Sequence, residues 1–527
     1  MKISEYTSCD AVGLANLIAR GEVTAAEVAD AAARAVEAVN PHINAVAETW
    51  PPEDTPAPGS APLAGVPFLI KDLGVTMAGK RSELGSRLAA GIVSPEDSFL
   101  MRRFRQAGLV TIGRTTTPEM AYSTTTEPEF YGATRNPWSP ARSAGGSSGG
   151  SGAAVAAGIV PLAHATDAAG SIRVPASSNG LFGLKPTRGR VSHGPGADEV
   201  FSGLAVQGSL SRTVRDSAVL LDLIEGPEPG DPYFAARPAR PYAEEARLAP
   251  GRLRIAVLRQ PWGGRQPAEA VSAALSEVVG LLESLGHAIE ETPLALGVSW
   301  EDFVLGNARM WTANLAPWID GIAAATGRPV DETTLEPVTL ASYRYGHQVT
   351  ADELVRALAI RNQVSRTFAQ HFARHDLLLS PTLPEPPVPL GVYGEGADHL
   401  DGLGWLERIL DRSPYTAAAN VSGVPSMSVP LAEDEGLPIG MQFTAAFGRE
   451  DLLFRLAGQL EQAAPWTHRK PPVWAAGQPP ESTVDSQLPV TRVPPLTDPD
   501  DDVRVLARLG KRCDDSGGGG GRWSSPA

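Results

Sequence analysis

Apolar residues recur at helical spacing near the start of the chain. The spacing predicts a helix over residues 11–19 and a second helix that begins at Thr24, because Thr24 and Glu27 fit a capping box. The apolar run GVPFLIKD at 65–72 predicts a short buried strand. It ends on Lys71, and a charge is unusual at the end of a core strand.

Helical and strand-like patterns alternate through the rest of the chain, with one proline- and charge-rich interruption at 225–251. The predicted strands lie at 109–113, 162–166, 253–258, 287–291, 376–379, 426–430 and 438–443. The predicted helices lie at 96–106, 213–223, 300–325, 350–373 and 449–463, with one more that ends near 285. This alternation predicts an α/β fold with a largely covered sheet.

Composition and net charge exclude several classes of protein. The 527 residues include 54 Gly and 47 Pro, with 42% hydrophobic and 20% charged residues, which favours a folded core and argues against a coiled coil or a disordered chain. The net charge of −15 disfavours nucleic acid and anionic membranes as partners. The two cysteines, Cys9 and Cys513, lie near opposite ends of the chain and cannot form a disulfide framework or a four-ligand zinc site.

The chain ends suggest where the protein acts and where its fold ends. The N-terminus has no signal-peptide pattern, and no apolar stretch is long enough to cross a membrane, so we expect a soluble, cytoplasmic protein. Residues 475–527 are rich in proline and glycine and have little apolar periodicity. We expect them to be a disordered tail behind a single domain over 1–474, so that removing them would leave activity and melting temperature unchanged.

The most unusual segment is the Gly/Ser loop GGSSGGSG at 145–152, which runs into a helical pattern. It lacks the lysine of a P-loop and the glycine spacing of a dinucleotide-binding turn. Gly145, Ser147 and Gly149 do match the G-x-S-x-G elbow of Ser-His-Asp hydrolases, but the residues before them are turn-like rather than a strand. From these residues alone, an elbow and a flexible linker both remain open.

A second serine lies on a turn of small residues, in ATDAAGSIRVPA at 165–176. The strand-like segment ends at Asp167, and small side chains at 168–170 leave backbone N–H groups uncovered before Ser171. Uncovered N–H groups of this kind are what an oxyanion hole requires. A lysine that ends a strand, a Gly/Ser loop and a serine on a small-residue turn together indicate acyl-transfer chemistry.

These motifs resemble the amidase signature family. GGSSGGSGAAVA, DAAGSIRVPA, GVPFLIKD, LFGLKPTRGR, SGVPSMSVP and GLPIGMQF match its pattern in order, over about residues 5–474. The resemblance implies an α/β fold with a large mixed sheet covered by helices on both faces. It divides the domain into N-terminal helices (5–60), a catalytic core (61–225), a variable substrate-pocket region (226–410) and a C-terminal core (411–474).

The resemblance also implies a Ser-Ser-Lys triad: Ser171 as nucleophile, Ser147 as proton relay after a cis peptide bond, and Lys71 as final base. Burial beside an apolar strand should lower the pKa of Lys71 enough for the amine to accept a proton. No metal and no organic cofactor are implied. The remaining site residues are the oxyanion-hole backbone at Ala168, Ala169, Gly170 and Ser171, and the supporting side chains Ser148, Asp167 and Arg173.

Ala169 departs from the family, where many members have glycine, and it would strain the turn if that backbone needs a positive φ. Several stretches, including TTEPEFYGATRNPW and GREDLL, are most similar to the 6-aminohexanoate cyclic-dimer hydrolase subgroup. The expected activity is hydrolysis of a small linear or cyclic amide. The alternatives are the glutaminase subunit of a tRNA-dependent amidotransferase, an elbow-type hydrolase, or a scaffold without activity; a homodimer is left open.

The remaining histidines and aromatic residues are interpreted as structural. Trp300, Asn307 and Trp311 follow a helical pattern in the variable region and are expected to be ordinary core residues. His164 lies in an apolar strand and is expected to be a core histidine with satisfied hydrogen bonds. His371 and His375 share one helical face, but a third metal ligand is missing from the motif, so a solvated helix end is predicted.

Overall fold

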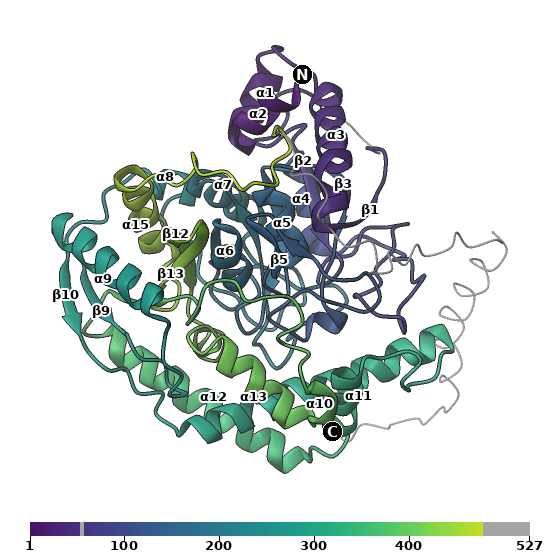
Figure 1. The fold of residues 1–527 in the computed structure, drawn as a ribbon, viewed down its shortest axis with the longest axis vertical. Helices are drawn as coiled ribbons and strands as arrows, with labels where there is room; N and C mark the ends of the chain where they lie inside the picture. Colours follow the sequence, from purple (N-terminus) through teal and green to yellow (C-terminus); the bar gives the residue numbers. More distant parts are fainter. Residues whose placement is uncertain (53–56, 478–527) are drawn as a thin grey trace, which may run out of the picture.

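The computed structural model describes residues 1–52 and 57–477 of the chain. Within these residues the predicted α/β architecture is confirmed: a mixed eleven-stranded sheet lies between helices (Figure 1). The described chain runs three residues past the predicted domain end, and there the Ala475 N–H donates to the Ala157 carbonyl at 2.9 Å. The rest of the predicted tail, 478–527, lies outside the described residues.

The strand order of the large sheet is β1-β3-β2-β6-β8-β7-β12-β13-β11-β9-β10, and β4 and β5 form a separate pair. The strands are β1 (Val46–Thr49), β2 (Pro67–Lys71), β3 (Val110–Thr115), β4 (Arg135–Asn136), β5 (Ser139–Ser143), β6 (Leu162–Asp167), β7 (Phe182–Lys185), β8 (Val206–Ser211), β9 (Arg254–Val257), β10 (Ala288–Glu291), β11 (Leu377–Pro381), β12 (Ser426–Asp434) and β13 (Leu437–Ala445).

Strand direction brings the chemically interesting residues to one edge of the sheet. β2 runs parallel to both β3 and β6, with Leu69 opposite Ala163. The carboxyl ends of parallel strands meet at the same edge, so Lys71, the last residue of β2, lies near Thr166 and Asp167 at the end of β6. From β6 through β8, β7, β12 and β13 to β11 the pairs are antiparallel.

Alternating side chains show that the sheet is covered on both faces. On β9, Ile255 and Val257 belong to one buried apolar cluster, whereas Ala256 belongs to another. The first cluster takes residues from α1 (Ile3–Ser8), α2 (Ala11–Ala19), α3 (Ala25–Ile43), α4 (Phe99–Gln106), α5 (Gly149–Ala156), α6 (Arg173–Asn179), α7 (Val214–Ile224), α8 (Tyr242–Glu245), α9 (Glu269–Ser284) and α15 (Glu450–Ala463).

The second cluster is built mainly from helices of the variable region. Its helices are α10 (Trp300–Thr326), α11 (Pro337–Gly346), α12 (Ala351–Phe372), α13 (Gly402–Arg412) and α14 (Ala417–Ser422). α10 to α13 lie together along one side of the molecule, far from the N-terminal helices α1 to α3 (Figure 1). The same cluster includes Ala256 of β9 and also Ala168 and Ala169, which follow β6.

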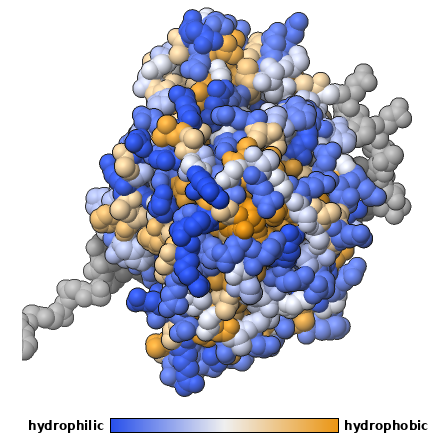
Figure 2. All heavy atoms as spheres, turned by 90° about the vertical axis from the view of Figure 1, so that its left-hand side faces the viewer, coloured by the Kyte–Doolittle hydropathy of each residue, from blue (hydrophilic) through white to orange (hydrophobic). Residues whose placement is uncertain are grey.

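The surface over α9 and α15 is mostly hydrophilic, with hydrophobic residues gathered near the middle of that face (Figure 2). Among the described helices, none combines the length and the apolar character that crossing a bilayer requires. Short single-turn segments at Glu119–Ala121 and Ala397–His399 complete the helical elements of the described chain.

Candidate active site

Lys71 is fully buried at the end of β2 and contacts three hydroxyl groups. Its Nζ atom lies 2.7 Å from Ser147 Oγ, 2.9 Å from Thr166 Oγ1 and 3.1 Å from Ser148 Oγ. Burial lowers the pKa of Lys71 to about 7, although the negative charge of Asp167 partly opposes this shift. Near neutral pH a large share of the amine is therefore uncharged, and it can accept a proton from a neighbouring hydroxyl.

Ser147 lies in a tight loop that leads into α5, and its side chain is almost completely buried. The Gly146–Ser147 peptide bond is cis, as the resemblance implied. Thr117 Oγ1 donates to the Ser147 carbonyl at 3.1 Å. Gly146 must be glycine here, because a Cβ atom would lie 2.4 Å from the Thr125 carbonyl oxygen. Close packing on both sides therefore fixes the Ser147 backbone.

Ser148 links this loop to the end of β6. Its Oγ atom donates to the Thr166 carbonyl at 3.3 Å and accepts from the Thr166 N–H at 3.2 Å. Gly150, in the first turn of α5, packs directly on Thr116, where a Cβ atom would lie 2.6 Å from the backbone nitrogen. The Ser147 loop thus rests against the ends of β3 and β6 at once.

The turn after β6 is organised around Asp167. Its carboxylate accepts hydrogen bonds from the Gly170 N–H at 2.8 Å and the Ile172 N–H at 3.1 Å, and it pairs with Arg173 at 2.9 Å. Burial alone would raise the pKa of Asp167, but the charge and hydrogen bonds of Arg173 outweigh it and lower the pKa to about 2. This geometry agrees with the predicted structural role of the pair.

Ser171 follows Gly170 on this turn, and its residue surface is 5% exposed. Gly170 has φ +136°, whereas Ala169 is not among the residues with positive φ, so the anticipated strain at Ala169 is absent. Of the four backbone N–H groups expected to form an oxyanion hole, that of Gly170 already donates to the Asp167 carboxylate. Within the described chain, the N–H groups of Ala168, Ala169 and Ser171 have no protein acceptor.

Arg173 ties the turn to the C-terminal part of the fold. Besides Asp167, it donates to the Thr416 carbonyl at 2.7 Å, to Gln442 Oε1 at 2.8 Å and to Asn420 Oδ1 at 2.6 Å. Sequence reasoning did not single out Thr166, Thr416, Asn420 or Gln442. The sequence offered only one hint, that Thr416 and Asn420 lie six and two residues before the SGVPSMSVP motif.

The structure joins some predicted site residues directly and others only through neighbours. Lys71, Ser147 and Ser148 form one hydrogen-bonded group, and Asp167 with Arg173 forms another. In the described part of the chain no hydrogen bond joins Ser147 to Ser171. Such contacts often tighten only when substrate binds.

The histidines differ from one another. His164 is fully buried, and its pKa falls to about 3 because of burial; it accepts from the Lys71 N–H at 3.3 Å and bonds Gln207 at 2.8 Å, which confirms a core role. The predicted solvated end at His371 and His375 is wrong: both residues are buried and their rings stack at 4.6 Å. His375 Nε2 also lies 2.9 Å from Glu290 Oε2 of β10. The described residues hold no cluster suited to a metal ion.

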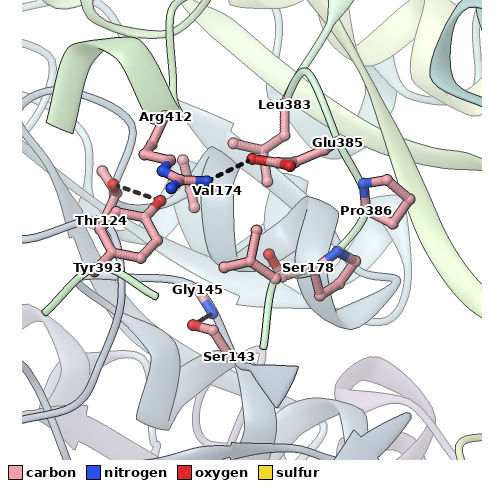
Figure 3. A pocket seen from close by; sticks show the side chains of 12 residues that line it. Thr124, Ser143, Gly145, Val174, Ser178, Leu383, Glu385, Pro386, Tyr393 and Arg412 are labelled. Carbon is pink, nitrogen blue, oxygen red and sulfur yellow. Dashed lines mark hydrogen bonds and ion pairs between the residues drawn. The ribbon is translucent and has the colours of Figure 1, made fainter. Parts of the chain in front are cut away.

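A small pocket that is open to solvent borders both serine segments (Figure 3). Gly145 belongs to the Ser147 loop, and Val174 and Ser178 lie on the helix that follows Ser171. At the far side Arg412 Nη1 donates to Glu385 Oε1 at 3.2 Å. The lining residues are Thr124, Ser143, Gly145, Val174, Ser178, Leu383, Glu385, Pro386, Pro387, Val388, Tyr393 and Arg412.

The chain is similar in sequence to known proteins. The family model described as Amidase matches residues 22–454. The chain belongs to the amidase signature family. The amidase is 40% identical over 483 residues to the 6-aminohexanoate-cyclic-dimer hydrolase of Paenarthrobacter ureafaciens, covering 88% of this chain and 96% of the relative. Its relatives by name are amide hydrolases, and this chain is an enzyme of that class.

Solved structures of amidase signature enzymes have the same fold as this chain. A structure of 6-aminohexanoate cyclic dimer hydrolase superposes on the amidase with a TM-score of 0.82 and 36% identity, covering 89% of this chain and 99% of that one. A chain of the glutamyl-tRNA(Gln) amidotransferase from Thermotoga maritima is less similar, with a TM-score of 0.68 and 25% identity over 90% of this chain and 98% of that one. The amidotransferase alternative is therefore not favoured.

Proposed function

We propose that the amidase hydrolyses a small linear or cyclic amide through an acyl-enzyme formed on Ser171. Ser171 Oγ bonds to the amide carbonyl carbon, its proton passes to Ser147, and the Ser147 proton passes to neutral Lys71. When the C–N bond breaks, the same relay returns a proton to the leaving nitrogen. Water then attacks the ester by the same route and releases the carboxylate and free Ser171.

The oxyanion of the tetrahedral intermediate would be held by the N–H groups of Ala168, Ala169 and Ser171, which follow β6 on the small-residue turn. Each donor of this kind contributes about 3 kcal/mol to transition-state stabilisation. Asp167 and Arg173 position the turn and do not touch the reacting atoms.

The observation that carries this proposal is the 2.7 Å contact between Lys71 and Ser147, where burial brings the pKa of Lys71 to about 7. A lysine with an unperturbed pKa would be almost fully protonated at neutral pH and could not act as a base. The elbow alternative would need a histidine beside Ser147. His164 instead accepts a hydrogen bond from the Lys71 backbone N–H.

The finer expectations about location and partners follow from charge and composition. A net charge of −15 and the scarcity of cysteine support a cytoplasmic enzyme with no nucleic-acid partner. Its partner would be the small amide substrate, and the reaction as written needs no cofactor.

A serine-directed fluorophosphonate probe with intact-mass analysis tests the nucleophile. The wild-type enzyme should gain one adduct, Ser171→Ala should gain none, and Ser177→Ala, on the helix that follows Ser171, should be labelled like the wild type. If Ser171→Ala is labelled and Ser147→Ala is not, the elbow mechanism replaces this one. A panel of aliphatic, aryl and cyclic amides then identifies the substrate class. Glutaminase activity that depends on a co-purified partner would favour the amidotransferase.

A further inference from the structure

The pairing between β2 and β6 ends before it reaches Lys71. β2 pairs with β3 from its first residue to its last, but it pairs with β6 at a single position, where Leu69 lies opposite Ala163. If this parallel ladder continued, the Lys71 N–H would donate to the His164 carbonyl, and the Lys71 carbonyl would accept from the Thr166 N–H. The two strands that carry the site therefore separate at the residue proposed as the base.

Two serines at the start of α5 bond the edge of β6 where the ladder opens. Ser151 Oγ donates to the His164 carbonyl at 2.7 Å, and Ser148 Oγ accepts from the Thr166 N–H at 3.2 Å. Both backbone groups that would have paired with Lys71 are thus bonded to hydroxyls. A buried backbone N–H needs an acceptor, so another group has to supply one for the Lys71 N–H.

The His164 imidazole is the group that supplies this acceptor. The Asp72 N–H donates to the Thr115 carbonyl of β3 at 3.1 Å. Successive N–H groups of an extended chain point to opposite edges, so the Lys71 N–H points toward β6, where it lies 3.3 Å from His164 Nδ1. A side chain of β6 therefore makes the hydrogen bond that the opened ladder gives up.

The second nitrogen of the imidazole connects His164 to the chain beyond Lys71. Because Nδ1 accepts from an N–H, the ring proton lies on Nε2, which donates to Gln207 Oε1 at 2.8 Å. The Gln207 side-chain nitrogen donates in turn to the Gly74 carbonyl. These contacts, the His164–Gln207 bridge, hold the segment of Lys71 at two points: its own N–H and the carbonyl three residues later.

The surroundings of the His164–Gln207 bridge are closely packed. Gly74 has φ +87°, and a Cβ atom there would lie 2.6 Å from Thr166 Cγ2 and 3.1 Å from Gln207 Oε1. The Phe104 ring meets the imidazole edge-on, with centroids 5.8 Å apart. His164 is fully buried, and burial lowers its pKa to about 3, so the ring is neutral at neutral pH. Its contribution is therefore to geometry rather than to charge.

We propose that the His164–Gln207 bridge positions Lys71 by fixing its backbone, so that Nζ stays within hydrogen-bond reach of Ser147. This inference rests on the proposed function and deepens it by adding a positioning residue that does not touch the reacting atoms. The 2.7 Å contact between Nζ and Ser147 Oγ depends on where the Lys71 side chain leaves the strand. A displacement of about 1 Å at a catalytic group can lower the rate about a hundredfold.

A second histidine makes the same pair of contacts elsewhere in the fold. His287 Nδ1 accepts from the Leu253 N–H at 3.2 Å, and His287 Nε2 bonds Gln459 Oε1 at 2.9 Å. Like His164, it is buried. Leu253 directly precedes β9, which lies six strands from β6 in the sheet. His287 therefore provides a matched control, with the same hydrogen bonds but no contact with the site.

The test measures labelling of Ser171 by the fluorophosphonate probe at several probe concentrations, which gives a maximal rate, kinact, and a half-saturating concentration, KI. His164→Phe keeps a ring but removes both nitrogens, and it should lower kinact about a hundredfold while KI changes by less than about threefold. His164→Asn keeps an acceptor near the position of Nδ1 and should recover kinact to within about tenfold of the wild type. His287→Phe should leave kinact within about twofold.

The variant Lys71→Met shows whether His164 acts through Lys71. When His164→Phe is added to Lys71→Met, labelling should slow by less than about a further twofold, because no amine is left to position. A merely structural histidine would slow the double variant by its full factor. Gln207→Leu removes the acceptor of Nε2 and should lower kinact about tenfold. It carries the test if thermal melting shows that His164→Phe does not fold.

Three results would overturn the inference: folded His164→Phe or Gln207→Leu with wild-type kinact, equal losses in His164→Phe and His287→Phe, or a full additional loss in the double variant with Lys71→Met. Failure of the proposed function looks different. In that case Ser171→Ala would still take up the probe, or Lys71→Met would be labelled as fast as the wild-type enzyme.

Discussion

The ends of β2 and β7 look alike in composition but differ in chemistry. Each strand ends on a lysine that is fully buried, and burial lowers the pKa of both Lys71 and Lys185 to about 7. By charge and burial alone the two amines are equivalent. A lowered pKa therefore does not by itself identify a catalytic lysine.

The difference lies in the hydrogen-bond partners. Lys71 contacts the hydroxyls of Ser147, Ser148 and Thr166, whereas Lys185 donates to the carbonyl of Pro186 at 2.8 Å. A hydroxyl can accept a proton from one neighbour while it donates its own to another, but a carbonyl only accepts. The comparison teaches that a proton relay needs both a low pKa and a partner that can pass the proton on.

Replacing each lysine by methionine should give the largest difference in kcat/KM between Lys71 and Lys185. Lys71→Met removes the proposed base and should lower kcat/KM by about 10³-fold. Lys185→Met should keep kcat/KM within about tenfold of the wild type, because nothing reactive adjoins that amine. Steady-state kinetics on one amide checks both variants. Equal losses of kcat/KM in the two variants would contradict the proposal that only Lys71 acts as a base.

The pH dependence of activity should follow Lys71 alone. The amine must be neutral to accept a proton, so kcat/KM should rise with pH and level off above about 7, near the pKa of Lys71. Below that value it should fall about tenfold per pH unit. The profile of Lys185→Met should have the same midpoint. A midpoint that moves in this variant would show that Lys185 is coupled to the reaction.

Lys71 and Lys185 should contribute equally to the pH dependence of the free energy of unfolding. Both amines are neutral in the fold at pH 8 but protonated in the unfolded chain, whose lysine pKa is about 10.4. The unfolded state then binds more protons, so unfolding free energy rises with pH above about 7, by about 1 kcal/mol per pH unit for each lysine. Urea unfolding at pH 7.5 and 8.5 should show that each methionine variant lowers this slope by the same amount. If only one variant changed the slope of unfolding free energy against pH, the pKa values of the two lysines would not be lowered equally.

The smallest effect is expected at Ser148. Removing its hydroxyl deletes one of the three contacts of Lys71 but keeps the contact with Ser147. Loss of one hydrogen bond of about 1 kcal/mol corresponds to about a fivefold fall in kcat for Ser148→Ala. A fall as large as that of Lys71→Met would place Ser148, rather than Ser147, in the relay.

Sequence patterns predicted the elements with clear periodicity. The helix at 11–19 was predicted with the bounds of α2, and the capping box at Thr24 is present before α3. β8 was missed because its sequence, VQGSLS, lacks an apolar run, yet all of it is buried. Its polar side chains pair locally, as Ser211 does with Ser217 at 2.8 Å. α11 and α13 were not predicted, and both lie in the variable region.

The site was predictable where it depends on short motifs and unpredictable where it depends on distant contacts. Lys71, Ser147 and Ser171 lie in recognisable segments. Thr416 and Asn420 contact Arg173 across more than 240 residues of sequence. A local sequence pattern cannot predict a contact between residues so far apart. The prediction for His371 and His375 failed for a related reason, because His375 contacts Glu290 of β10, which lies 85 residues earlier in the sequence.

The dependence of Arg173 on late residues has a consequence during synthesis. The ribosome releases Lys71, Ser147 and Ser171 long before Thr416, Asn420 and Gln442, which complete the surroundings of that guanidinium. A nascent chain therefore carries the proposed reactive groups while the turn that holds Ser171 still lacks these contacts. We therefore expect the proposed hydrolase activity to appear only after residues 416–442 have been synthesised and have folded onto Arg173.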